Sequence, residues 1–224
     1  MTITEHTWVE TDNPCNLYWI LDELGIASQR KCRLAAIACS RRVWDLLTEA
    51  HRQFIEISER YADKNAKFTQ MRAARKLIPD YLPTPNAKIL DTGYRDSRSA
   101  LYMVLGELVG FWTNKVKMEW STVQSGYWPE RVIWFQECDM LCQLLRDIFG
   151  NPFRPVTLDP RWLTSTVLDL ARTIYNQRVW ERMPILADAL MDAGCDDAEI
   201  LNHCRSAGPH VLGCWVVDLI LGKE

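Results

Sequence analysis

The chain has 224 residues, of which 48% are hydrophobic and 25% charged, and its net charge is −3. This length allows one large domain or two small ones, and the two fractions exclude a wholly disordered chain. No part of the sequence carries the excess of lysine and arginine that phosphate binding requires, so nucleic acid is an unlikely partner.

The sequence predicts a cytoplasmic protein without a membrane span. Its first 14 residues contain no basic stretch followed by an apolar run, which is the pattern of a signal peptide. Its apolar stretches are far shorter than the ~20 residues that cross a bilayer. Eight cysteines in a chain of this kind are expected to be reduced thiols.

Apolar residues recur at helical spacing along most of the chain, and strand-like alternation stays short. Asn13-Pro14 and Ser28 are typical helix starts, and Asp196 with Glu199 resembles a capping box. We expect helices over residues 14–24, 29–47, 48–64, 66–78, 97–116, 129–149, 164–177, 184–193, 197–205 and 210–221. The predicted class is all-α, an irregular multi-helix bundle of about nine or ten helices with no significant sheet.

The helical pattern is broken at residues 79–96, a stretch that contains three prolines. We expect a single helical domain over 1–224, or else two lobes, 1–78 and 97–224, joined by this loop. Residues 129–149 are apolar on more than one face, which predicts a central buried helix around which the others pack.

The strongest candidate for a chemical site is a group of cysteine and histidine residues near the C-terminus. The group consists of Cys195, His203, Cys204, His210 and Cys214. Of these, Cys195, Cys204, His210 and Cys214 could bind zinc, with His210 and Cys214 one turn apart on the last predicted helix. The spacing lacks the close cysteine pair of a structural zinc knuckle, and cysteine is often buried simply as a small apolar residue. We therefore favour core thiols and no cofactor, with zinc as the alternative.

A second set of residues could contact a partner. Arg41 and Arg42 belong to a basic run that could face phosphate or an acidic partner, although a solvated face or pairing with the acidic C-terminal third of the chain is the simpler interpretation. Trp120, Trp128 and Trp162 lie outside the helical stripes and could act as interface anchors or could close the core.

Two segments resemble an expanded family of uncharacterised bacterial proteins known from planctomycete genomes. One is QRKCRLAAIACSRRVWDLLT at 29–48, and the other runs from NPFRPVTLDP to GPHVLGCWVVDLILGKE at 151–224. The family has no known activity, so the resemblance implies a bacterial cytoplasmic protein and no catalytic residue.

Motifs of catalysis are missing from the sequence. There is no G-x-S-x-G, no phosphate-binding glycine loop, no G-x-G-x-x-G and no H-E-x-x-H. We therefore expect a Trp-rich, non-enzymatic protein that binds another macromolecule, most simply a protein. The alternative is a zinc-binding protein, with metal-dependent hydrolysis as one form of it.

Overall fold

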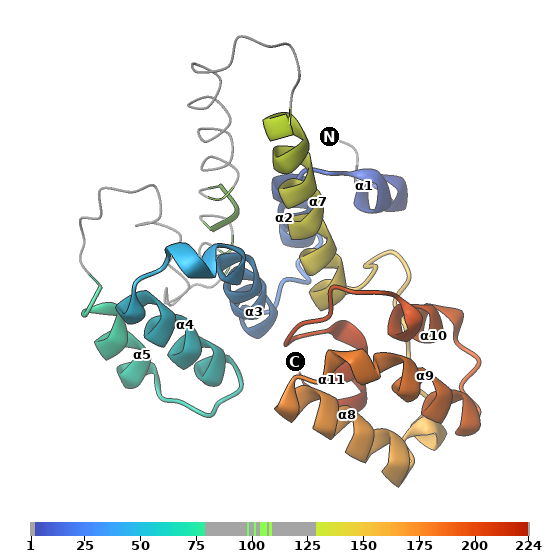
Figure 1. The fold of residues 1–224 in the computed structure, drawn as a ribbon. Coiled ribbons are helices and arrows are strands. Elements are labelled where there is room, and N and C mark those ends of the chain that lie inside the picture. The colour runs from blue at the N-terminus through green and yellow to red at the C-terminus, as the bar shows by residue number, and fades with distance from the viewer. Residues whose placement is uncertain are drawn as a thin grey trace. The chain divides into compact units, whose positions relative to one another are not determined.

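The computed structural model describes residues 3–78, positions 98, 101, 104–106 and 108, and residues 129–223. All regular elements among these residues are helices, which confirms the predicted all-α class (Figure 1). None of the described helices combines the length and apolar character that a bilayer crossing requires. The chain divides into two compact units, Met1–Leu145 and Arg146–Glu224.

The first unit begins with helices whose caps are visible in the sequence. Its helices are α1 (Glu5–Glu10), α2 (Pro14–Glu23), α3 (Gln29–Ser40), α4 (Glu49–Ala62), α5 (Phe68–Arg75) and most of α7 (Pro129–Phe149). Asn13 caps α2 by accepting from the backbone N–H of Cys15, and Ser28 caps α3 by accepting from that of Lys31. Helix α1 was not predicted, because six residues are too few for a helical period to show.

The helix expected over 29–47 is interrupted. After α3 the chain forms a 3-10 segment, Arg41–Leu46, in which Val43 has a non-helical φ of −115°. The guanidinium of Arg52 donates to the carbonyl oxygen of Trp44 and lies over its ring. This contact holds the 3-10 segment against α4, which also packs along α3 and α5 (Figure 1).

The predicted boundary between lobes, residues 79–96, lies outside the described residues. Of the helix expected over 97–116, the described positions are helical, and Leu101, Leu105 and Leu108 are fully buried. Helix α7 has the predicted start and end, and Leu141 and Leu145 on it are buried.

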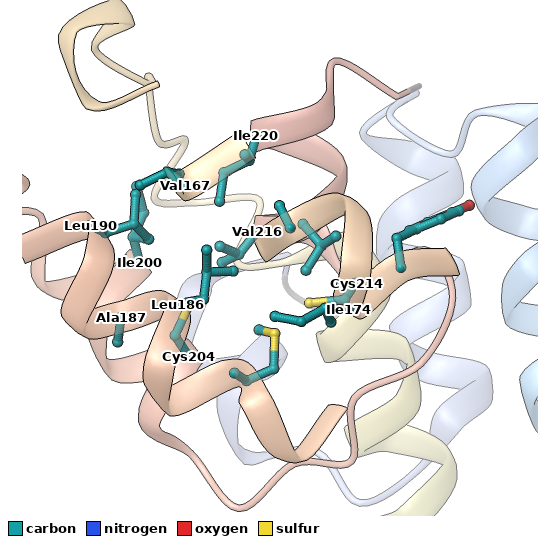
Figure 2. Close-up of a cluster of buried hydrophobic side chains, with 14 of the residues drawn as sticks. Val167, Ile174, Leu186, Ala187, Leu190, Ile200, Cys204, Cys214, Val216 and Ile220 are labelled. Atoms are coloured by element: carbon teal, nitrogen blue, oxygen red, sulfur yellow. The ribbon is translucent and has the colours of Figure 1, made fainter. Parts of the chain in front are cut away.

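The second unit is a small helical core. It contains α8 (Ser165–Gln177), α9 (Met183–Asp192), α10 (Ala198–Arg205), α11 (Trp215–Leu221) and two short 3-10 turns, η4 (Pro160–Trp162) and η5 (Trp180–Arg182). Figure 2 shows side chains from all four α-helices meeting in one cluster, with Ile174, Leu186, Ile200 and Val216 among them.

The cap of α10 and the start of α11 differ from those predicted from the sequence. Helix α10 is capped by Asp197, which accepts from the N–H groups of Glu199 and Ile200, and not by Asp196. The last helix begins at Trp215 rather than at residue 210. Gly213 has a φ of +96°, which no α-helix contains, so the helix cannot start before it.

Candidate metal centre

The loop between α10 and α11 carries two of the residues singled out above, His210 and Cys214. It turns at Gly208, whose φ is +89°, and the Gly208-Pro209 peptide bond is cis. A Cβ at Gly208 would lie 2.9 Å from the backbone nitrogen of His210, so only glycine fits there. The loop then reaches Cys214, the residue directly before α11.

Four side chains of the second unit meet at this loop. They are Asp147 near the end of α7, His203 on α10, and His210 and Cys214 from the loop. One donor atom from each lies within 4.8 Å of the other three. Among the residues that the structure describes, no other group of three or more histidine, cysteine and acidic side chains converges in this way.

Asp147 connects the two histidines. Its Oδ1 lies 2.9 Å from Nδ1 of His210 and 3.2 Å from Nε2 of His203. Its Oδ2 accepts from the backbone N–H of Val211 at 3.0 Å. Burial pushes the pKa of Asp147 upward, but the hydrogen bonds from His203 and His210 more than offset this effect and hold the pKa below its usual value. The carboxylate is therefore charged although its side chain is only 3% exposed.

Cys214 completes the group. It is fully buried, and its Sγ lies 3.1 Å from Nε2 of His203. Burial, and then the negative charge of Asp147, raise the pKa of this thiol well above its usual value. Without a nearby cation to favour the thiolate, Cys214 stays protonated and is a poor nucleophile.

A second layer holds His203 in place. Trp215, the first residue of α11, donates its indole N–H to Nδ1 of His203 at 3.0 Å. The ring of Trp215 lies against Gly150, where a Cβ would come within 3.1 Å of it, so a larger residue at 150 would displace the ring. His203 is thus contacted on both ring nitrogens.

The geometry does not fit a cysteine–histidine–aspartate nucleophile. In such a triad the two ring nitrogens of the histidine face the nucleophile and the acid separately. Here the same nitrogen, Nε2 of His203, faces both Cys214 and Asp147, and Trp215 occupies the other nitrogen. The donor set instead matches the ligands of zinc, which binds cysteine sulfur, histidine nitrogen and carboxylate oxygen.

The structure brings together two of the four residues that the sequence suggested for zinc. His210 and Cys214 belong to the group, whereas Cys195 and Cys204 lie in the hydrophobic core of the unit. Figure 2 shows Cys204 and Cys214 within the cluster of buried side chains. Burial raises the pKa of Cys204 to about 12, as expected of a core thiol.

Asp147 was not predicted from the sequence, and His203, although a member of the cysteine–histidine group, was not chosen as a zinc ligand. Asp147 had a readable signal, because it is an acidic residue between Leu144, Leu145 and Ile148 on the apolar face of a helix. A buried carboxylate needs a partner, so its position predicts a cation or a hydrogen-bond donor nearby.

The residues proposed to contact a partner lie in several places. Arg41 pairs with Glu59 at 3.0 Å, and Arg42 pairs with Glu137 at 2.8 Å, both within the first unit. Trp162 is partly buried against the core of the second unit. Trp120 and Trp128 lie outside the described residues.

Comparison with family models, with curated proteins and with solved structures found no match. The function must therefore be argued from the group around Asp147.

Proposed function

We propose that this chain is a non-enzymatic zinc-binding protein, in which the ion joins the loop before α11 to α10 and to the end of α7. The observation that carries the proposal is the meeting of Asp147, His203, His210 and Cys214, whose donor atoms lie within 4.8 Å of one another. Four donors, three of them nitrogen or sulfur, form a ligand set typical of zinc.

The spacing of the donor atoms supports an ion of this size. With zinc–ligand bonds of about 2.0–2.3 Å, neighbouring ligand atoms in a tetrahedral site lie about 3.3–3.8 Å apart. The contacts of His203 and His210 to Asp147 and Cys214 are 2.9–3.2 Å. Zinc binding would therefore lengthen these three short contacts by a few tenths of an ångström, and donor pairs near the 4.8 Å limit would close by about 1 Å.

The charges of the group also favour a divalent cation. A zinc ion offsets the charge of the Asp147 carboxylate and stabilises Cys214 as a thiolate, so that the buried site becomes neutral overall. The proton of Cys214 leaves when the metal binds, and zinc affinity consequently falls as the pH falls.

A structural role fits better than a catalytic one. Catalytic zinc sites keep one coordination position open for water or substrate, whereas structural sites are closed by four protein ligands. This group can supply four ligands, and both Asp147 and Cys214 are buried. A closed, buried ion would stabilise the unit without catalysing a reaction.

Cobalt(II) titration tests the proposal. The wild-type protein should bind one equivalent of cobalt and show the charge-transfer absorption of a thiolate–cobalt bond. Cys214→Ala should abolish this absorption, whereas Cys204→Ala, another fully buried thiol of the same unit, should keep it. If the wild-type protein gave no cobalt spectrum, or if Cys204→Ala alone removed it, the assignment would be wrong.

A macromolecular partner remains a separate proposal drawn from the sequence. A structural zinc site is compatible with it, because such sites commonly stabilise small binding domains. Isolation of the native protein with its bound partners tests it, and an isolated monomer in every preparation would count against it.

A further inference from the structure

The hydrogen bond between Trp215 and His203 bears directly on metal binding. An indole N–H can only donate, so Nδ1 of His203 must accept and carries no proton. In a neutral imidazole the proton is then on Nε2, which faces Cys214 and Asp147.

A metal ion needs the opposite tautomer. The atom of His203 that faces the other donors is Nε2, and it can coordinate only through a lone pair. The single proton of the neutral ring must then move to Nδ1. Metal-bound histidines normally donate this second N–H to an acceptor. Here it would meet the indole N–H of Trp215, and two donors at 3.0 Å cannot bond to each other.

We infer that zinc binding releases Trp215 from His203, so that the indole and the metal ion compete for the same histidine. This inference rests on the proposed zinc site. The indole N–H can find water once released, because Trp215 is only partly buried. Trp215 is the first residue of α11 and lies against Gly150, so its release couples the occupancy of the site to the start of α11 and the turn after α7.

The indole resonance of Trp215 reports the competition in the wild-type protein. In a proton–nitrogen NMR spectrum of the full chain, the ten tryptophans give separate indole signals. Zinc chloride should shift the Trp215 signal toward that of a water-exposed indole and speed its exchange with solvent. Trp215→Phe identifies the signal by its loss, and contacts with the His203 ring identify it if that variant does not fold.

The affinity for zinc gives an independent readout. Trp215→Phe removes the competing donor, so zinc should bind roughly threefold to tenfold more tightly, which corresponds to the net free energy of one hydrogen bond. Trp180→Phe is a matched control, because Trp180 also packs against the core of this unit. It does not belong to the metal group, that is, the four residues Asp147, His203, His210 and Cys214. Its zinc affinity should equal that of the wild type.

The outcomes separate this inference from the proposed function. If the wild-type chain binds no zinc, both fail. If it binds one equivalent of zinc while the Trp215 signal stays unchanged, zinc binding stands, and both the competition and the place of His203 among the four ligands are refuted. His203 would then remain outside the coordination shell as a hydrogen-bond donor to Cys214 and Asp147.

Discussion

Asp147 is the residue that links the parts of the metal group, because its two oxygens contact both histidines and the backbone of Val211. The contacts with the two histidines keep the pKa of Asp147 below its usual value although the carboxylate is buried. The residue therefore contributes to stability even before any ion binds.

Replacing Asp147 by asparagine keeps the shape of the side chain but removes its charge. We expect Asp147→Asn to abolish stoichiometric zinc binding and to lower the free energy of unfolding by about 1–3 kcal/mol, the usual cost of weakening a buried, charge-assisted hydrogen-bond network. Urea unfolding and metal analysis measure the two effects. Asp139→Asn is the control, since Asp139 is exposed on the same helix; an equal loss in both variants would contradict the role given to Asp147.

His51 in the first unit makes folding sensitive to pH independently of the metal group. It is buried, and its Nδ1 lies 2.6 Å from Oγ1 of Thr48. Burial, and then the positive charge of Arg75, lower the pKa of His51. Near pH 6.5 the unfolded chain therefore takes up a proton at His51, whereas the folded chain takes it up only at a lower pH. The free energy of unfolding consequently falls as the pH drops from about 6.5 toward the pKa of His51 in the folded chain.

The change His51→Gln removes this proton uptake. The difference in unfolding free energy between pH 7.5 and pH 5.5 should be smaller in His51→Gln than in the wild type, as measured by urea unfolding of both proteins. An unchanged difference would show that His51 is not the group responsible.

At the scale of the elements, helix starts were the features most readable from the sequence. Asn13 and Ser28 were identified as caps because their side-chain oxygens can accept from free backbone N–H groups, and the structure places them in that role. Helix ends that depend on neighbouring elements were harder to predict. The 3-10 turn after Ser40 depends on Arg52, and no local pattern encodes that contact.

The identity of the residue that caps α10 can be tested by replacing Asp196 and Asp197 one at a time. Asp197 accepts from two backbone N–H groups, whereas Asp196 is exposed. Asp197→Ala should lower the free energy of unfolding by about 1 kcal/mol, the typical cost of losing a cap, and Asp196→Ala should leave it nearly unchanged. Urea unfolding of the two variants measures both losses. A larger loss of stability in Asp196→Ala than in Asp197→Ala would support Asp196 as the cap, as inferred from the sequence.

At the scale of the whole molecule, the periodic apolar residues were sufficient to predict the all-α class. The metal group was only half predictable. His210 and Cys214 were paired for the wrong geometric reason, since they were expected on one helix and instead lie in a loop that Gly208 and Gly213 turn. Asp147 and His203 are distant in sequence, and only the fold of the second unit brings them together.

The basic run near residue 40 shows a similar limit. Its side chains could be recognised as candidates for pairing, but the acidic partners could not be chosen from sequence alone. The structure pairs Arg30 with Asp63 and Arg41 with Glu59, so these acidic partners belong to the first unit and not to the C-terminal third that the sequence suggested. Contacts between helices decide such pairs, and helical periodicity does not encode them.

Metal content measured together with thermal unfolding gives the strictest test of whether the chain holds one zinc ion that stabilises the fold. The purified protein should contain about one zinc per chain, and a strong chelator should remove the zinc and lower the melting temperature. Zinc at 100 times its Kd should restore about 2.7 kcal/mol of stability. A protein purified in the presence of zinc that contained none, and whose melting temperature did not respond to the chelator, would contradict the claim.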